Sequence, residues 1–402
     1  MLPAKKLGDV CKFVRGPFGG SLKKSCFKEK GNAVYEQQHA IYNQFSEIRY
    51  FIDDEKFEEM KRFELKPGDL IMSCSGTMGK VAIVPDGIKK GVINQALLKL
   101  TPNDNLGVEY LRYWMNSPDF IQRIEESTVG AAIKNVASVK ILKEINIPIP
   151  PLQEQQQIVT ILDQAFEAIN QAKANIEINI ENAKELFQSK LNDIFSQKGD
   201  GWQEKTFKEL SSRIGDGIHG TPEYDEDGEY FFINGNNLNN GEIEIKENTK
   251  RVNLEQYEKH YRELNDNTVL ISINGTLGKV AFYNNEPVIL GKSACYINFN
   301  KEVQKHYIKY LVKSPLFFEN MSKMSTGATI KNFSLKSMRA YSLFLPPLNE
   351  QCLIVDHLNK LEFNLFSILD TYTNKLESLE ELKKSILQKA FAGELTNKMV
   401  EV

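Results

Sequence analysis

Ile-Pro-Ile-Pro-Pro-Leu-Gln-Glu-Gln, at residues 147–155, opens a long heptad-patterned stretch that ends at Phe195, and the chain contains this arrangement twice. The second copy opens with Leu-Phe-Leu-Pro-Pro-Leu-Asn-Glu-Gln at residues 343–351 and ends at Phe391. In both copies, apolar residues recur at alternating spacings of four and three, which is typical of a coiled-coil seam. We therefore predict two long helices that pair with each other. The predicted packing positions are Ile158, Leu162, Ile169 and Ile176 in the first helix and Ile354, Leu358, Leu365 and Tyr372 in the second.

Start and stop signals bound the two helices. Pro151 and Pro347 suit a first helical turn, where the missing N–H would have no partner anyway. A glycine follows each pattern, as expected just beyond a helix C-terminus. The predicted helical segments span residues 151–198 and 347–396, and the 44 residues Leu152–Phe195 alone would form a helix about 66 Å long. Because a rod of this length has only a narrow apolar stripe, it requires a partner helix.

Composition narrows the class of protein. At 402 residues the chain is expected to hold two or more domains. Its five cysteines are scattered with no metal or redox spacing, which favours reduced thiols in a cytoplasm. With no signal-peptide pattern and no long apolar run, we expect a cytoplasmic protein without membrane contact. The net charge is −3, yet residues 1–150 carry 22 basic and 18 acidic side chains.

The segments before the two helices share three landmarks in the same order. The paired landmarks are the turns at 75–80 and 274–279, the helical stretches at 110–114 and 307–311, and the Gly-Ala-x-Ile-Lys-Asn motifs at 130–135 and 327–332. The whole unit is therefore duplicated. Residues 15–65 and 213–265, in contrast, share almost nothing recognisable. A repeated scaffold with dissimilar inserts suggests two domains that are built alike and recognise different things.

We predict two α/β (α+β) globular domains, at residues 1–150 and 199–346, joined by the two helices. The first contains expected strands at Leu70–Ser73 and Val81–Val84 and an expected helix at Val108–Met115. A linker of only about a dozen residues, Ser196–Phe207, leads from the heptad pattern of the first helix into the second domain. If the helices pair along their length, they must be antiparallel, with a globular domain at each end and a pseudo-twofold internal repeat.

The Gly-Thr-x-Gly-Lys turns suggest either phosphate contact or a simple strand connection. A Walker motif is excluded because Cys74 and Ile273 stand where it requires glycine. A glycine-built turn joining two strands remains as plausible as direct contact with DNA phosphates. The residues that would make that contact are Thr77, Lys80, Thr276 and Lys279.

Two further groups of residues are candidates for DNA contact. Lys134-Asn135 and Lys331-Asn332 suit a phosphate anchor, although each asparagine equally suits a helix cap. Base-edge reading in the major groove is plausible for residues of the divergent loops, although ordinary surface loops look the same. These loop residues are Arg15, Lys23, Lys24, His219 and Thr221, together with the amide-bearing stretches Gln37-Gln38-His39 and Asn234-Gly235-Asn236-Asn237.

The sequence also contains a lysine series at helical spacing and lacks familiar catalytic motifs. Lys301, Lys305, Lys309 and Lys313 would share one helical face, with a solvated face the more common explanation than phosphate binding. Hydrolase, metalloprotease and methyltransferase motifs are missing, and Glu64-Leu65-Lys66 is too short to indicate a nuclease. Three hypotheses stay open: a DNA-sequence-reading subunit, an enzyme with an unrecognised site, and a coiled-coil scaffold.

In combination, these motifs resemble the specificity subunit of type I restriction-modification systems. The resemblance rests on Pro-Pro-Leu-x-Glu-Gln at 150–155 and 346–351, the paired Gly-Thr-x-Gly-Lys turns, and Leu-Gln-Lys-Ala-Phe-Ala-Gly-Glu-Leu at 387–395. The first helix departs from the family pattern, because Leu186–Leu191 matches this closing motif only loosely.

The resemblance implies a non-catalytic subunit with two target-recognition domains, each reading one half of a bipartite double-stranded DNA target. The helices would set the spacing between the halves. It further implies two copies of a modification subunit, which binds S-adenosylmethionine and methylates adenine N6, and a restriction subunit driven by ATP and Mg²⁺. This chain itself would hold no cofactor and no metal.

Overall fold

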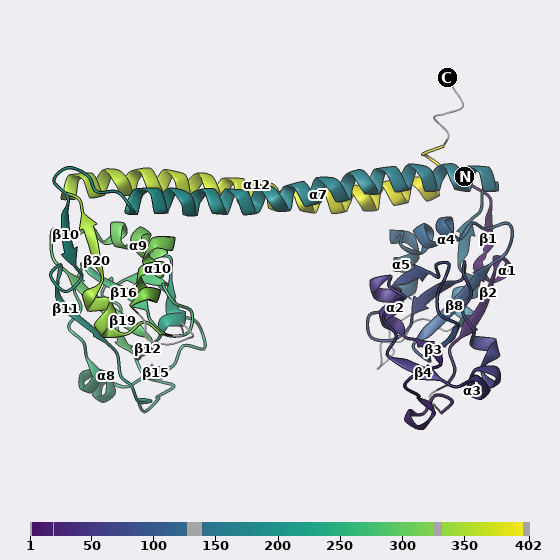
Figure 1. The fold of residues 1–402 in the computed structure, drawn as a ribbon, viewed down its shortest axis with the longest axis horizontal. Helices are drawn as coiled ribbons and strands as arrows, with labels where there is room; N and C mark the ends of the chain where they lie inside the picture. Colours follow the sequence, from purple (N-terminus) through teal and green to yellow (C-terminus); the bar gives the residue numbers. More distant parts are fainter. Residues whose placement is uncertain (1, 19, 127–138, 325–331, 397–402) are drawn as a thin grey trace, which may run out of the picture. The chain divides into compact units, whose positions relative to one another are not determined.

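The computed structural model of the chain describes residues 2–18, 20–126, 139–324 and 332–396. It forms two compact units (Figure 1). Unit 1 consists of Met1–Ile176 and Asn374–Val402, and unit 2 is the continuous segment Glu177–Thr373. Each unit therefore contains one globular part and portions of both long helices. Within the described ranges, no helix is long and apolar enough to cross a membrane.

Two sheets form the globular part of unit 1. The larger is antiparallel, with strand order β2-β8-β5-β6. Its strands are β2 (Cys11–Arg15), β8 (Leu97–Pro102), β5 (Leu70–Ser73) and β6 (Val81–Ile83). The smaller has the order β4-β3-β7, in which β3 pairs antiparallel with β4 and parallel with β7. Its strands are β4 (Tyr50–Ile52), β3 (Asn32–Tyr35) and β7 (Gly91–Ile93).

Short helices and one strand pair connect these sheets to the long helices. The pair is β1 (Ala4–Lys6) with β9 (Asn146–Pro148), the strand that leads into the first long helix. The other elements of unit 1 are α1 (Leu7–Val10), η1 (Lys24–Cys26), α2 (Gln37–Tyr42), α3 (Asp54–Glu59), η2 (Lys61–Phe63), α4 (Val108–Met115), α5 (Pro118–Glu126) and α6 (Val139–Glu144). The strands and the helix expected around residues 70–84 and 108–115 are thus present within one residue.

Unit 2 repeats this plan. Its four-stranded sheet has the order β11-β19-β16-β17, its three-stranded sheet the order β15-β12-β18, and β10 pairs with β20. The strands are β10 (Gln203–Thr206), β11 (Ser211–Asp216), β12 (Tyr230–Ile233), β13 (Leu238–Asn239), β14 (Glu242–Ile243), β15 (Arg251–Val252), β16 (Thr268–Ser272), β17 (Val280–Phe282), β18 (Val288–Leu290), β19 (Ala294–Phe299) and β20 (Ser342–Leu345). Its short helices are η3 (Gly235–Asn237), α8 (Leu254–His260), α9 (Lys305–Lys313), α10 (Pro315–Lys323) and α11 (Leu335–Ala340).

The divergent segments fold alike despite their dissimilar sequences. In unit 1 the register pairs Ala33 with Gly91 and with Phe51, and in unit 2 it pairs Phe231 with Val288 and with Arg251. The helix that follows is capped in the same way in both units: the Asp53 side chain accepts a hydrogen bond from the Lys56 N–H, and Asn253 accepts one from Gln256. The structural duplication therefore includes the segments whose two sequences are dissimilar.

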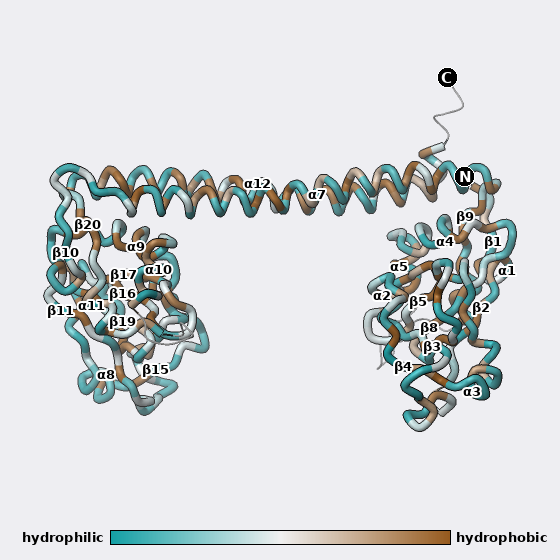
Figure 2. Tube along the Cα trace, in the orientation of Figure 1, coloured by the Kyte–Doolittle hydropathy of each residue, from teal (hydrophilic) through white to brown (hydrophobic). Residues whose placement is uncertain are grey.

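The long helices are α7 (Leu152–Phe195) and α12 (Leu348–Ala392). Apolar and polar positions alternate along both (Figure 2). In unit 1 they run antiparallel, since the start of α7 meets the chain beyond α12 through Glu154 and Thr396, whereas Lys173 pairs with Glu380. In unit 2 the end of α7 packs against the start of α12. The predicted fold class, α/β domains with long antiparallel helices and an internal repeat, is confirmed.

Each globular part packs its core against both helices. In unit 1, the core shared with α4 includes Ile158, Leu162 and Ile169 of α7 and Leu387 and Ala390 of α12. In unit 2, the equivalent core joins Leu191, Phe195 and Phe207 to Val355 and Leu358. Of the other predicted packing positions, Ile176 is buried, and Ile354, Leu365 and Tyr372 are half-buried.

The ends of the two helices are equivalent. Phe195 packs edge-on against Tyr307, with ring centroids 5.1 Å apart, and Phe391 packs in the same way against Tyr110 at 5.2 Å. The counterpart of the closing motif in the first helix is therefore the segment around Leu191–Phe195. The match suggested by sequence, Leu186–Leu191, lies about one turn too early.

Candidate nucleic-acid interface

Four strands of unit 1 end at one edge of the globular part. Because β3 and β7 are parallel neighbours, the loops that follow them lie side by side. The Asn94 N–H donates to the Tyr35 carbonyl at 2.9 Å, and the Cys74 N–H, just after β5, donates to the Ala96 carbonyl at 2.8 Å. The Gly16 N–H, just after β2, donates to the Leu97 carbonyl at 2.9 Å. We call the loops that begin at residues 16, 36, 74 and 94 the strand-end loops of unit 1.

Unit 2 has the same edge. The Gly291 N–H donates to the Ile233 carbonyl at 2.8 Å, and the Ile273 N–H donates to the Ser293 carbonyl at 3.0 Å. The Ile218 N–H, after β11, donates to the Leu290 carbonyl at 2.8 Å. The strand-end loops of unit 2 begin at residues 217, 234, 273 and 291. Loops held on a rigid scaffold in this way are a common place for binding residues.

The Gly-Thr-x-Gly-Lys turns connect β5 to β6 and β16 to β17. A buried serine organises each turn: the Ser73 hydroxyl donates to the Thr77 carbonyl at 2.6 Å and accepts from the Lys80 N–H at 3.0 Å. Ser272 makes the same two bonds with Thr276 and Lys279, at 2.6 and 2.8 Å. The backbone of both turns therefore agrees with the prediction of a glycine-built turn that joins two strands. It leaves the side chains of both threonines and of Lys80 exposed, whereas Lys279 is half-buried.

Lys279 lies near the carboxylate of Glu244, which itself pairs with Lys246 at 3.2 Å. Hydrogen bonds from Asn239 and Lys246, with the nearby charge of Lys279, lower the pKa of the Glu244 carboxyl below its ordinary value. The equivalent Lys80 is exposed and has no ion-pair partner within the part of the chain that the structure describes.

The remaining predicted residues are distributed unevenly. Arg15 ends β2 beside the strand-end loops and is half-buried. Lys23 and Lys24 are exposed at η1, and the chain next pairs with β4 through the Lys28 N–H and the Phe51 carbonyl. They therefore lie in the later part of the loop that begins at residue 16, where the chain approaches β4. His219 and Thr221 are exposed in the loop after β11. The His219 Nε2 lies 2.9 Å from the Asp216 carboxylate.

The Lys-Asn motifs fall partly outside the described residues, which exclude Lys134, Asn135 and Lys331. Asn332 is exposed and forms an isolated bridge with Asn274, next to the glycine-rich turn. The capping alternative for Asn332 is wrong, because the side chain of Ser334 caps α11 by accepting the Ser337 N–H at 3.0 Å. The structure thus brings Asn332 to the strand-end loops through Asn274.

Charge further restricts where unit 2 can approach a polyanion. Residues 213–265 carry 12 acidic and 6 basic side chains. Many of the acids lie in the loop at 223–229 and on α8. The Asp225 N–H donates to the Arg251 carbonyl at 2.9 Å, so the acidic part of that loop lies beside β15 at the start of β12, whereas exposed Lys292 follows β18 at the opposite edge. The strand-end loops are therefore the electrostatically better face for phosphate contact.

Sequence reasoning missed the residues that fix each globular part to its helix. Gln155, in Pro-Pro-Leu-Gln-Glu-Gln, is buried; its Oε1 accepts the Gly107 N–H at 2.9 Å, and its Nε2 donates to the Asn105 and Pro150 carbonyls at 3.0 and 2.8 Å. Gln351 is fully buried and makes the same three bonds, each 2.9 Å long. The sequence signal for this contact was the glutamine that ends both Pro-Pro-Leu-x-Glu-Gln motifs. A glutamine side chain is stable in a protein interior when its amide groups have hydrogen-bond partners.

A second polar contact joins α9 to α12. The Glu362 carboxylate accepts hydrogen bonds from Tyr310 at 2.9 Å, from Lys313 at 2.8 Å and from Lys309 at 3.3 Å. Burial and the charge of Lys313 lower the pKa of Lys309, whereas bonds from Lys313 and Tyr310 lower the pKa of Glu362 despite its burial. The predicted lysine stripe is therefore wrong in part: Lys301 is exposed but precedes α9, and Lys309 and Lys313 pair with Glu362 instead of lying on a solvated face. In unit 1, Tyr113 instead contacts Asp163 of α7.

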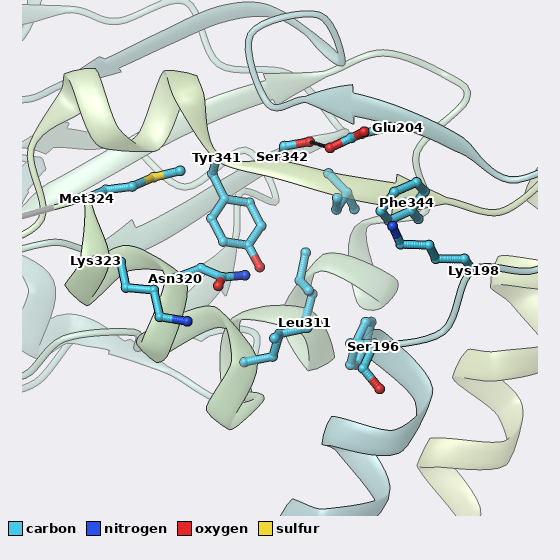
Figure 3. Close-up of a pocket in the computed structure, with 13 residues that line it drawn as sticks. Ser196, Lys198, Glu204, Leu311, Asn320, Lys323, Met324, Tyr341, Ser342 and Phe344 are labelled. Carbon is cyan, nitrogen blue, oxygen red and sulfur yellow. Dashed lines mark hydrogen bonds between the residues drawn. The ribbon is translucent and has the colours of Figure 1, made fainter.

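One cavity of unit 2 lies where the end of α7 meets the globular part (Figure 3). Its volume is about 480 Å³, and it is lined by the end of α7 and by β20, α9 and α10. The Lys198 ammonium lies 4.2 Å from the centroid of the Phe344 ring, and Ser342 donates to Glu204 at 3.0 Å. This cavity is built by the junction and is separate from the strand-end loops.

Comparison with known proteins agrees with the duplicated plan. Relatives include the StySPI specificity subunit of a type I restriction enzyme from Salmonella potsdam, 26% identical over 74% of this chain and 67% of its own length. A putative MjaX specificity subunit from Methanocaldococcus jannaschii is 25% identical over 86% of this chain and 82% of its own length.

Solved structures share the fold. A chain from a structure of a type I R-M system superposes with a TM-score of 0.72 at 18% identity, over 98% of this chain and all of that one (100%). The HsdS subunit from Thermoanaerobacter tengcongensis gives a TM-score of 0.60 at 17% identity, over 98% and 97% of the two chains.

The family model described as the type I restriction modification DNA specificity domain matches the chain twice, over residues 4–182 and 199–386. Each match covers one globular part and most of the long helix that follows it. This chain therefore belongs to the family of type I restriction modification DNA specificity domains.

Proposed function

We propose that this chain is the non-catalytic DNA sequence-recognition subunit of a type I restriction-modification complex. Each globular part reads one half of a bipartite double-stranded DNA target, and the helix pair sets the length of the unread spacer. The observation that carries the proposal is the duplicated scaffold with chemically different loops at one matched edge. Two such edges on one chain suit two different half-sites.

The proposal extends to partners and cofactors. Two copies of a modification subunit would supply S-adenosylmethionine and methylate adenine N6, and a restriction subunit would supply ATP- and Mg²⁺-dependent cleavage. The net charge of −3 fits a subunit that shares DNA contact with partners, because phosphate neutralisation need not come from this chain alone. The setting would be the cytoplasm, where DNA and these partners are available.

A domain exchange tests the proposal. Residues 200–346 are replaced by those of a relative with a different target, the complex with modification subunits is reconstituted, and methylated sites are mapped by sequencing. We expect one half-site to change and the other to stay. If both halves changed, or neither did, the assignment of one half-site to each domain would be wrong. Turnover of DNA by the purified chain alone, with Mg²⁺ or S-adenosylmethionine, would favour the enzyme hypothesis instead.

A further inference from the structure

We infer that each recognition domain contacts base edges through two side chains at matched positions: Gln38 and Gln95 in unit 1, and Asn236 and Lys292 in unit 2. This inference rests on the proposed function and deepens it, because it names the residues that make the two half-sites different. Nothing in the sequences of the divergent loops aligns Gln38 with Asn236. Their equivalence comes from the structure.

The strand registers establish that equivalence. Tyr35 of β3 pairs with Ile93 of β7, and Ile233 of β12 pairs with Leu290 of β18. Gln38 and Asn236 both stand three residues after the first strand of the pair. Gln95 and Lys292 both stand two residues after the second. Since both strand pairs are parallel, the two loops of each domain leave the same edge next to each other.

The turn that carries Gln38 and Asn236 is locked in the same way in both domains, by different residues. In unit 1 the Glu36 N–H donates to His39 Nδ1 at 2.9 Å, and His39 Nε2 lies 3.1 Å from the Glu47 carbonyl. In unit 2 the Asn234 N–H donates to the Asn237 Oδ1 at 3.0 Å. The locked residues are buried, so His39 and Asn237 have no free group to offer a base.

Asn237 completes the parallel with His39, because its Nδ2 donates to the Glu244 carbonyl at 2.9 Å. In each turn, the residue just before the locked residue has no side-chain partner among the described residues. This residue is Gln38 in unit 1, which is half-buried, and Asn236 in unit 2, which is exposed. A rigid turn that presents one amide without a protein partner loses little conformational entropy on binding.

The neighbouring loop supplies the second side chain. In unit 2 the Ser293 hydroxyl accepts the Gly235 N–H at 2.9 Å and donates to the Asn234 Oδ1 at 2.9 Å, which fixes Lys292 beside the turn of Asn236. In unit 1, the Asn94 side chain accepts the Ala96 N–H at 3.0 Å and so shapes the loop of Gln95. Gln95 and Lys292 are exposed, and neither side chain has a partner within the described ranges.

The chemistry of the two pairs differs. Asn and Gln amides pair bidentately with adenine N6 and N7, whereas lysine donates to guanine O6 and N7 in the major groove. Unit 1 presents two amides and unit 2 presents an amide and an ammonium. The half-site read by unit 1 is therefore expected to depend on adenines at both contacted positions, and that read by unit 2 on an adenine and a guanine.

A reciprocal substitution tests the inference in the full chain, reconstituted with modification subunits on a library of randomised DNA sites. Lys292→Gln is expected to move the preference at one position, in the half-site of unit 2 only, from guanine to adenine by roughly 5- to 150-fold. Gln95→Lys is expected to produce the opposite change in the half-site of unit 1. Lys208→Gln is the matched control, since Lys208 is exposed before β11, away from the strand-end loops.

The outcomes separate this inference from the function on which it rests. Unchanged base preference in both variants, with methylation retained, would overturn it, as would a change in both half-sites from one substitution. A second variant, Asn236→Ala, should lower selectivity at a single neighbouring position by a similar factor. If the unsubstituted complex showed no bipartite preference at all, the proposed function itself would fall. Thermal unfolding of all variants verifies that these surface changes leave the fold intact.

Discussion

Replacing Gln351 with leucine removes the three hydrogen bonds that fix the second globular part to the start of α12. The Pro346 carbonyl is left buried without its partner, and the Glu302 carbonyl and Gln304 N–H lose theirs in a region that water partly reaches. A buried polar group that loses its hydrogen-bond partner costs about 1–3 kcal/mol of stability, and each lost hydrogen bond in the partly buried region costs less. Because leucine fills most of the same volume, we expect unit 2 to lose about 2–5 kcal/mol of local stability.

Amide hydrogen exchange is the suitable assay, since a chain with two units need not unfold in one step. Amides of α9 and the start of α12 should exchange roughly 30- to 4,000-fold faster in Gln351→Leu, with little change in unit 1. The control is Asn349→Leu, an exposed residue on the same turn, for which a change within about 0.5 kcal/mol is expected. Equal protection in the two variants would refute the role assigned to the amide.

A carboxylate at the same position gives a second, pH-dependent test. In Gln351→Glu the charged oxygens would face the Glu302 and Pro346 carbonyls, which raises the pKa of the new carboxyl in the folded state. A raised folded-state pKa means that the folded form binds the proton more tightly, so the variant should lose stability as pH rises above about 4.3. Protection of α9 amides that did not improve between pH 7 and pH 4 would contradict this reasoning.

Three further predictions concern other parts of the chain. Glu362→Gln should destabilise unit 2 by about 3 kcal/mol at pH 7, because Lys309 and Lys313 lose their carboxylate partner. Since the pKa of Glu362 is lowered in the folded state, the stability difference between the variant and the unsubstituted chain should shrink as pH falls below 4.5. Thermal melts of both proteins at pH 7 and below pH 4.5 measure this difference. At pH 8, iodoacetamide should modify the exposed Cys352 at least about 100-fold faster than Cys74, whose burial raises its thiol pKa to about 11; comparable labelling in peptide mass spectra would disprove the burial argument. Deleting four residues from each long helix at matched positions removes about 6 Å of each rod and should shorten the spacer of the methylated motif, and an unchanged spacer would remove the ruler function.

Most of the fold was accessible from sequence because the decisive signals are periodic or repeated. The heptad pattern located α7 and α12 to within a few residues, and strands such as Leu70–Ser73 stood out as short apolar runs beside a glycine-rich turn. Burial of the apolar stripe is a requirement that few residue types satisfy, so it leaves a clear pattern. The same holds for the turns, where Gly76 and Gly275 adopt positive φ angles of 64° and 75°.

The shared fold of the divergent segments was inaccessible for the opposite reason. His39 and Asn237 perform one task, accepting a backbone N–H and contacting a carbonyl further along, yet nothing in their side chains is alike apart from that capacity. Hydrogen-bond roles tolerate such exchange, whereas core volumes and helix periods do not. Sequence therefore suggested candidate amides without showing which of them are held in the interior.

Lys309 illustrates how a pattern can suggest the wrong environment. An i, i+4 series of lysines usually marks a solvated face, but here α9 packs against α12 and Glu362 accompanies the lysine into the interior. The partner lies 53 residues away in sequence, so no local window reveals it.

The discontinuity of unit 1 has a consequence for its synthesis. Its core requires Leu387 and Ala390, which emerge from the ribosome only after all of unit 2 has been made. At about 5–20 residues per second, roughly 11–45 s pass between the synthesis of Leu162 and that of Leu387, which covers the apolar face of α7. The first domain to be translated is thus the last to be completed. During that interval these apolar side chains of α7 lack the cover that α12 gives them in the finished chain.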